Sequence, residues 1–220
     1  VIPPAPSIIG GYEEITVIDA EPHATIELYN IDHQKVQSTE ADEQGTALLT
    51  GVEPELEYYV TQTVNHMVSD PSEQVKVNSK IAPLRPSSVS DVTLKEGGKL
   101  LVSWAEVSEW GTGQTHAYEV ELWMNGDRQQ AMTVDASAID GLPTIEWAIP
   151  LSIETDSAII RVKSVTDHGE SDYTISETFA IQFPKPGKPL IQLSETDWTN
   201  EDVTVTIQHG EVGWVGLKHT

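Results

Sequence analysis

The 220-residue sequence contains no cysteine, so no disulfide stabilises it and no thiol can serve as a catalytic nucleophile. No apolar run approaches the ~20 residues that a membrane-spanning helix needs. Basic residues are also scarce, with 12 Lys and Arg against 35 Asp and Glu, for a formal net charge of -23. Such a chain is repelled by nucleic-acid backbones and by anionic membrane surfaces, so we expect neither nucleic-acid binding nor membrane insertion.

Catalytic signatures are missing as well. The sequence has no G-x-S-x-G nucleophile motif and no H-E-x-x-H zinc motif, and its seven histidines are scattered without a close pair. Two carboxylates at a suitable separation could catalyse glycoside hydrolysis. Among 35 acidic residues, however, some pair will reach such a separation by chance, so a pair of this kind is no evidence for an active site. We therefore predict that the protein is not an enzyme.

Prolines are clustered at three places, at intervals close to the roughly 100 residues of one β-sandwich domain. The clusters are Pro3, Pro4 and Pro6; Pro83 and Pro86; and Pro184, Pro186 and Pro189. Proline cannot donate to a β-ladder and holds the chain extended, which suits joints between domains. We place the boundaries near residues 82 and 185, giving segments 1–82, 83–184 and 185–220. Because the first residues lack both a starting methionine and a signal peptide, we interpret the sequence as a piece of a longer protein.

Between the clusters, apolar and polar residues alternate over five to nine positions, and no segment keeps a helical period. This pattern predicts an all-β fold of tandem immunoglobulin-like and fibronectin type III-like β-sandwiches. The expected inner-face residues of the first module are Ile15, Val17, Ala24, Ile26, Leu28, Tyr58, Val60, Val75 and Val77, with Thr25, Glu27 and Thr61 turned to water. Those of the second are Val92, Leu94, Leu100, Val102, Trp104, Tyr118, Val120, Leu122, Ile160, Val162, Tyr173, Ile175 and Phe179.

The first module, over about residues 5–80, contains three short strand-like patterns. They are Ala24-Thr-Ile-Glu-Leu-Tyr29, Glu57-Tyr-Tyr-Val-Thr-Gln62 and Ser72-Glu-Gln-Val-Lys-Val77. These segments resemble the bacterial immunoglobulin-like repeats of large surface adhesins. They are also similar to the prealbumin-like collagen-adhesin B modules of Gram-positive pili, some of which carry a lysine–asparagine crosslink. That crosslink needs a lysine on the first strand, whereas the first lysine here is Lys35.

The second module, over about residues 83–183, resembles the fibronectin type III fold. The resemblance rests on Trp104 in the second strand, Tyr118 at the start of the third, the Asn125-Gly126 turn and the segment from Val162 to Ser171. One departure is that Ala158 stands where such folds usually place a tyrosine near the start of the sixth strand. We expect the corner there to be held in another way.

Residues 185–220 contain two strand-like patterns, Pro189–Leu193 and Trp198–Ile207, which resemble the opening of a further bacterial immunoglobulin-like repeat. A piece of this length buries too little surface to be stable alone. We expect a partial module over about residues 187–220, either truncated or completed by a strand from another copy of the protein.

Acidic pairs at module ends are candidates for calcium, the one cofactor that the pattern suggests, because hard oxygen ligands can stiffen a joint. The candidates are Asp19 with Glu21, Asp42 with Glu43, and Asp167 with Glu170 and Asp172. None has the spacing of a dedicated calcium loop, and acidic loop residues also form turns or simply face solvent.

Two tryptophans are candidates for ligand binding. Trp123 is out of phase with Leu122, which predicts that it projects from the outer face of its sheet, where it could stack on a sugar or pack on a neighbour. Trp110 lies in a Gly-rich loop at one pole of the second module, where it could bind a ligand or cap its own core. Trp147 alternates with Ile145 and Ile149, and Trp104 and Tyr118 fall on inward positions, so we expect all three in the core.

These patterns favour structural or spacer modules of a secreted bacterial cell-surface protein, such as an adhesin stalk or a surface-layer (S-layer) assembly. The alternative is a carbohydrate- or protein-recognition module that is accessory to a polysaccharide-degrading enzyme or an adhesin. The expected partners are other modules of the same chain or other copies of the protein, with cell-wall or extracellular glycan under the alternative. Fibronectin-like modules occur in both settings, so the fold alone does not choose between them.

Overall fold

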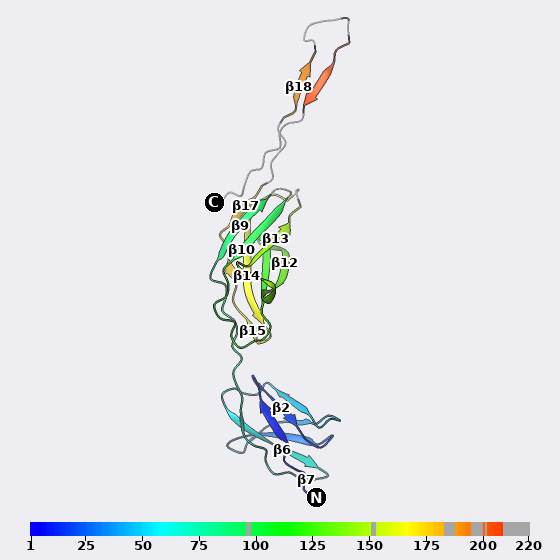
Figure 1. Cartoon of the computed structure of the whole chain (residues 1–220), viewed down its shortest axis with the longest axis vertical. Helices are drawn as coiled ribbons and strands as arrows, with labels where there is room; N and C mark the ends of the chain where they lie inside the picture. Colours follow the sequence, from blue (N-terminus) through cyan, green and yellow to red (C-terminus); the bar gives the residue numbers. More distant parts are fainter. Residues whose placement is uncertain (96–97, 151–152, 183–187, 195–199, 201, 209–220) are drawn as a thin grey trace. The chain divides into compact units, whose positions relative to one another are not determined.

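A computed structural model describes residues 1–95, 98–150, 153–182, 188–194, 200 and 202–208. The regular elements of the described residues are all β-strands, except for the short 3-10 turn η1 (Ala136–Ala138). None of their helices is long and apolar enough to cross a membrane. The chain divides into two compact units, residues 1–81 and 82–220, each with its own β-sheets (Figure 1). The predicted all-β fold of tandem β-sandwiches is confirmed.

The first unit is a sandwich of two antiparallel sheets, in which non-consecutive strands pair across the module. One sheet has the order β1-β2-β5, formed by β1 (Ser7–Gly10), β2 (Glu14–Ile18) and β5 (Ala47–Thr50). The other has the order β4-β3-β6-β7 with β8 also on β6, formed by β4 (Lys35–Glu40), β3 (Thr25–Asn30), β6 (Glu57–Val64), β7 (Met67–Val68) and β8 (Val75–Lys76).

The second unit repeats this connectivity, with two short strands on β14 where the first unit has β8 alone on β6. Its smaller sheet has the order β13-β10-β9, formed by β9 (Val89–Lys95), β10 (Lys99–Trp104) and β13 (Thr144–Ala148). Its larger sheet joins β12 (Asp127–Asp135), β11 (Ala117–Met124), β14 (Thr155–Thr166), β15 (Gly169–Glu170), β16 (Thr174–Ile175) and β17 (Phe179–Ile181). Although the two sequences suggested different relatives, both modules are immunoglobulin-like sandwiches of one design.

Each module has a separate apolar core between its two sheets. In the second, Trp104 is completely buried and its ring meets that of Tyr118 edge to face, with centroids 5.3 Å apart. Trp147 is buried in the same core, as its alternation with Ile145 and Ile149 predicts. In the first, alternating residues of β2 and β3 are buried, so the predicted period of two is confirmed there, whereas β6 is buried on both faces from Tyr58 to Gln62.

Three predicted orientations are wrong, and each has a local cause. Thr61 was expected to face water but is 8% exposed, because β6 lies inside the larger sheet, with β3 on one side and β7 and β8 on the other. Ile175 was expected in the core but is 54% exposed, and Tyr173 lies only half-buried on the outer face. The last strand of the second module is broken into β15, β16 and β17, so the period of two does not continue through it.

The final strand of each module is attached to its neighbour through serine side chains. In the first module, Ser72 N–H donates to the Val60 carbonyl (2.9 Å), while Val60 N–H donates to Ser72 Oγ (3.0 Å). The hydroxyl in turn donates to the carbonyl of the next residue, Glu73 (2.9 Å). Ser69 makes the same set of bonds with Gln62.

The second module uses Ser171 and Ser176 in the same way. Ser164 N–H donates to Ser171 Oγ (3.0 Å) and Ile160 N–H donates to Ser176 Oγ (2.9 Å). In return, Ser171 N–H donates to the Ser164 carbonyl and Ser176 N–H donates to the Ile160 carbonyl. A serine hydroxyl thus replaces a backbone carbonyl at two points in each module, which bends the edge strand and leaves it less able to pair with another chain.

A tyrosine corner, in which a tyrosine hydroxyl near the start of a strand binds a backbone carbonyl a few residues upstream, is present in the first module and absent from the second. Tyr58, near the start of β6, donates from its hydroxyl to the Glu53 carbonyl five residues upstream (2.9 Å). The equivalent position on β14 is Ala158, which is completely buried. Beside it, Thr155 Oγ1 donates to Asn125 Oδ1 in the β11–β12 turn (2.9 Å). The corner of the second module is therefore held by a threonine, as the missing tyrosine required.

In each module the chain arrives at one pole and leaves at the other. In the first, Gln62 Nε2 near the end of β6 binds the Pro4 carbonyl (2.7 Å), whereas Val77 N–H binds the Leu56 carbonyl beside the start of β6 (3.0 Å). In the second, Leu84 N–H binds the Glu109 carbonyl at the N-terminal pole (2.9 Å). Its last strand, β17, ends with Ile181 paired to Thr155 at the C-terminal pole.

The last described element is a hairpin of β18 (Leu190–Leu193) and β19 (Val205–Gln208). Its register places Ile191 opposite Ile207 and Leu193 opposite Val205, so these four side chains share one face. All are at least half exposed, with values of 50 to 61%. Trp198 and Trp214 lie outside the described residues.

Candidate functional site

The loop of residues 105–116, between β10 and β11, lies at the N-terminal pole of the second module. Within it, the indole of Trp110 stacks on the imidazole of His116, with ring centroids 4.6 Å apart and planes 7° apart. The same indole meets Tyr118 edge to face at 5.2 Å and packs against the apolar core. Trp110 is therefore half-buried, and it caps its own core as well as lining the surface.

The loop is fixed by a carboxylate from the opposite side of the pole. Asp167, in the turn after β14, accepts hydrogen bonds through Oδ1 from Gln114 N–H (2.7 Å), Thr115 N–H (3.1 Å) and Thr115 Oγ1 (3.2 Å). These bonds, led by the Thr115 backbone, lower the pKa of Asp167 to about 2. Gly113 is required between them, because a Cβ there would lie 2.4 Å from Thr166 Cβ and 2.8 Å from Asp167 Oδ1.

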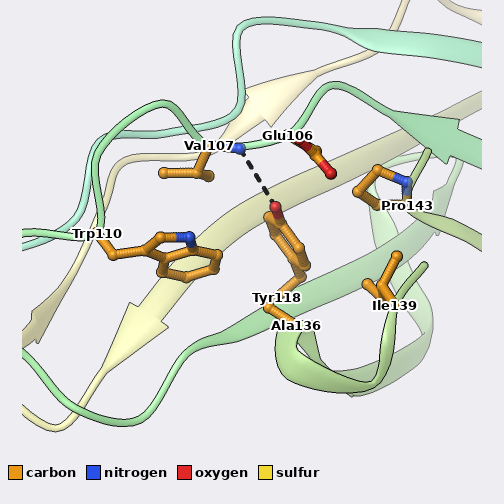
Figure 2. Close-up of a pocket in the computed structure, with 7 residues that line it drawn as sticks. All are labelled: Glu106, Val107, Trp110, Tyr118, Ala136, Ile139 and Pro143. Atoms are coloured by element: carbon orange, nitrogen blue, oxygen red, sulfur yellow. Dashed lines mark hydrogen bonds between the residues drawn. The ribbon is translucent and has the colours of Figure 1, made fainter. Parts of the chain in front are cut away.

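A small hollow of about 170 Å³ opens beside Trp110 (Figure 2). It is lined by Glu106, Val107, Trp110, Tyr118, Ala136, Ile139 and Pro143. The Tyr118 hydroxyl accepts the Val107 N–H (3.2 Å), and burial raises the pKa of this phenol. Since this oxygen serves the loop backbone, the small hollow is mainly a packing defect between the loop and the 136–143 segment.

A second and larger hollow of about 490 Å³ is lined by His116, the residue that stacks on Trp110. It is lined by Gln114, Thr115, His116, Ala117, Thr133, Asp135 and Ser137. His116 Nε2–H donates to the Gly113 carbonyl (3.1 Å), and Asp135 Oδ1 accepts from both the N–H and the hydroxyl of Ser137 (2.9 and 2.7 Å). Its functional groups are therefore fixed in place before any ligand arrives.

Trp123, the other candidate for ligand binding, lies on the outer face of the larger sheet but is only half exposed. The guanidinium of Arg161 lies 4.1 Å from the centroid of the Trp123 ring. The indole Nε1–H of Trp123 donates to Glu121 Oε2 (2.6 Å). Arg128, across the β11–β12 hairpin, pairs with the other oxygen of Glu121 (3.1 Å). Neighbours cover much of the ring, and Trp123 lines neither of the two hollows.

The first module has the same arrangement at the equivalent positions. Tyr29 donates from its hydroxyl to Glu27 Oε2 (2.9 Å), and Lys35 Nζ pairs with Glu27 Oε1 (2.9 Å). Lys35 is thus an ordinary ion-pair partner at the surface. We call each set of glutamate, aromatic residue and base the hairpin triad, and its presence in both modules indicates that it stabilises the hairpin.

The candidate calcium ligands lie apart and already have partners in several cases. Asp19 and Glu21 are exposed in the loop after β2. Glu170 pairs with Lys163 (2.7 Å), while Asp172 is exposed. Asp42 caps its own turn by accepting from Gln44 N–H, Thr46 N–H and Thr46 Oγ1, and the neighbouring Glu43 is exposed. Among the described residues, no group of three or more acidic or histidine side chains is assembled for a metal ion. The calcium hypothesis stays a prediction from the sequence.

Sequence reasoning identified Trp110 but missed the residues around the larger hollow. His116, Thr133, Asp135 and Ser137 are separated by up to 21 positions along the chain, and none belongs to a motif. The only local signal was the Asp-x-Ser spacing of residues 135–137, which is typical of a capped turn. That signal indicates a turn and says nothing of what the turn faces.

No family model matches this chain, and no curated protein matches it. Among solved structures it is similar to the FN1–FN3 domains of chicken CNTN1, with 13% identity, coverage of 99% of this chain and 88% of that chain, and a TM-score of 0.36. It is also similar to a segment of two fibronectin type III domains from chicken tenascin, with 15% identity, coverage of 82% and 98%, and a TM-score of 0.34. The fold class itself is established by the strand order and cores of this chain, which consists of tandem immunoglobulin-like or fibronectin type III-like modules.

Proposed function

We propose that the chain forms structural spacer modules of a secreted bacterial cell-surface protein, of the adhesin-stalk or surface-layer type. The observation that carries this proposal is the path of the chain through each sandwich. Each module receives the chain at one pole and releases it at the opposite pole. An eight-residue strand such as β6 or β11 spans about 27 Å, so every module adds a fixed length between whatever precedes and follows it.

The distribution of polar groups supports a structural role over a catalytic one. The serines of the edge strands, the Asp167 clamp and both hairpin triads all bind groups of their own module. These contacts use the chemistry of the side chains to fix strands and loops. In a spacer, the polar side chains need only bind other groups of the same module, whereas a catalytic site needs groups directed at a substrate.

The extracellular and bacterial setting is supported by composition and resemblance. A cysteine-free, strongly acidic chain stays soluble outside the cell and is not damaged by oxidation of thiols. The strand patterns of residues 24–29, 57–62 and 72–77 resemble adhesin repeats. We place the protein on the bacterial surface on these grounds.

Display on a cell surface tests the spacer function directly. A small reporter domain is fused before Val1, an anchor is placed after Thr220, and binding of reporter-specific antibody on large beads is compared with and without residues 82–182. We expect bead binding to increase with each module, because each one moves the reporter further from the wall. Binding of the free antibody, which is small enough to reach every reporter, corrects for the amount displayed. Equal bead binding by all versions would contradict the proposal.

We further propose other copies of the chain as partners, through the β18–β19 hairpin. An isolated two-stranded hairpin is marginally stable in water, and its face of Ile191, Leu193, Val205 and Ile207 is exposed. Light scattering at high concentration is expected to detect association, and the double substitution I191T/I207T should reduce it. A strictly monomeric wild-type protein would overturn this proposal.

A recognition role is the second candidate function, and the hollow beside His116 is the observation that favours it.

A further inference from the structure

The larger hollow at the N-terminal pole of the second module contains a preorganised aromatic ring. His116 is held on one face by the parallel indole of Trp110, and Nε2–H is bound to the Gly113 carbonyl. Trp110 lines the small hollow, whereas His116 lines the large one. The imidazole therefore carries the indole of Trp110 on one face and also lines the large hollow, and with Nε2 protonated its neutral form leaves Nδ1 as an acceptor.

Hydrogen-bonding groups of both kinds surround this ring. Asp135 uses Oδ1 for the Ser137 turn, and its Oδ2 accepts no hydrogen bond from the described residues. Thr133 is exposed on the edge strand β12, and the side-chain amide of Gln114 donates to the Thr112 carbonyl (3.5 Å). The side chains are short or fixed, so little rotamer entropy is lost when they bind a ligand.

The charge and size of the hollow restrict the class of ligand. Its lining has one carboxylate and no lysine or arginine, and the whole chain carries a charge of -23, which disfavours phosphorylated or acidic ligands. A cation would need several carboxylates or an aromatic cage, and neither lines this hollow. The volume of about 490 Å³ lies within the range of small-molecule sites and has room for one or two sugar rings.

We propose that this hollow is a binding site for a neutral pyranoside, whose C–H face packs on His116 while its hydroxyls bind Asp135, Thr133 and Gln114. The proposal goes beyond the spacer function and is independent of it, because a spacer module can also bind glycan at its pole. With few contacts on an open surface, the affinity for one sugar ring is expected to be on the order of millimolar.

The test is titration of the full ¹⁵N-labelled chain with methyl β-D-glucopyranoside, methyl N-acetyl-β-D-glucosaminide and cellobiose, followed by amide chemical shifts. We expect saturable shifts, for at least one probe, confined to residues 114–117 and 133–137. D135N should weaken that probe's binding at least several-fold, because the amide no longer accepts through both oxygens. T133W should abolish binding by filling the hollow from an exposed position on an edge strand, where it does not threaten the fold.

Matched controls are available in the first module. Asp42→Asn changes another carboxylate that caps a turn, and Ser38→Trp adds an indole to the exposed edge strand β4. Both should leave the shifts unchanged. The proposal is overturned if none of the three probes shifts the amides of this hollow, or if D135N and T133W bind as the wild type does while retaining their native spectra.

Discussion

Single serine hydroxyls maintain the edge strand of both modules. Ser72 Oγ is the acceptor for the N–H of Val60, a residue that is completely buried. Ser72→Ala leaves that N–H without a partner in the interior, which costs about 1–3 kcal/mol. Calorimetry should show a lower midpoint for the first module, by roughly 4 to 8 °C for each kcal/mol lost.

Two further variants separate this effect from a general loss of a hydroxyl. Ser176→Ala should lower the midpoint of the second module in the same way, because it removes the acceptor of the Ile160 N–H. Ser38→Ala removes an exposed hydroxyl on β4 and should change neither midpoint. Equal effects of all three substitutions would show that the serine contacts are not what stabilises the edge strands.

Asp167 is the residue whose ionisation matters most at the N-terminal pole. Three donors of the 105–116 loop bind its carboxylate, His168 Nε2 lies 3.9 Å away, and the pKa falls from the usual 3.8 to about 2. Because the folded value is depressed, the clamp contributes its full stability above pH 3.8 and loses it as the pH falls toward 2. Carboxyl NMR titration should therefore give a midpoint about two pH units below that of a free aspartate.

The partner variant Thr115→Val removes one donor to Asp167 without touching the carboxylate. The Asp167 midpoint should move up toward 3.8, while the backbone donors keep it below that value. A midpoint of 3.8 already in the wild type would show that the loop is not clamped in solution.

At the level of strands and hairpins, removing the glutamate charge of a hairpin triad should lower the stability of the second module more than that of the first. Burial alone would raise the pKa of Glu121, but the bonds from Trp123 and Arg128 outweigh it and the pKa is lowered. Its side chain is 5% exposed against 23% for Glu27. Glu121→Gln should cost about 1–3 kcal/mol by weakening bonds to a buried charge, and Glu27→Gln less.

Calorimetry of the two variants checks this order, with Glu146→Gln as a surface control. Glu146 pairs with Lys99 at 2.7 Å but is 40% exposed, so solvent screens the pair and the loss of its charge should lower the midpoint less than Glu121→Gln does. A Glu121→Gln midpoint no lower than that of Glu146→Gln would contradict a stabilising role for the triad.

The elements also show how far the sequence alone could predict this structure. Alternation along β2, β3, β10 and β11 predicted the core, since burial on one face imposes a strict period of two. The turn at Asn125-Gly126 could also be predicted, because an Asn-Gly pair favours a tight hairpin turn. Both residues have the positive φ that such a turn requires (52° and 88°). The breaks in the last strand of the second module could not be predicted, because whether a serine hydroxyl replaces a backbone acceptor depends on the neighbouring strand.

The candidate site was the least predictable part for the same reason. Trp110 could be suspected from its Gly-rich loop, but its stack on His116 arises only when the loop closes. Trp123 was correctly expected on the outer face, yet its cover comes from Arg161, 38 positions later on another strand. Side chains that gather from separate strands and loops leave no spacing by which a single sequence could reveal them.

For the whole molecule, net charge is the dominant long-range term. Residues 1–81 contain 14 acidic and 3 basic residues, and residues 82–220 contain 21 and 9, so both units carry a large negative charge. Repulsion between like charges destabilises each compact state, and it is screened over about 10 Å at 0.1 M salt. Raising NaCl from 0.05 to roughly 0.5 M should therefore raise both unfolding midpoints by a few degrees.

Calcium can be distinguished from this screening by matching ionic strength. If Asp19 with Glu21, or Asp167 with Glu170 and Asp172, binds calcium, the midpoint in CaCl₂ should exceed that in NaCl, and a chelator should reverse the difference. For the second cluster, calcium must compete with the loop N–H groups on Asp167 and with Lys163 on Glu170. Any excess should then appear first in the first module, where Asp19 and Glu21 are exposed. Equal midpoints in the two salts would contradict the calcium prediction and leave the acidic surface a matter of solubility.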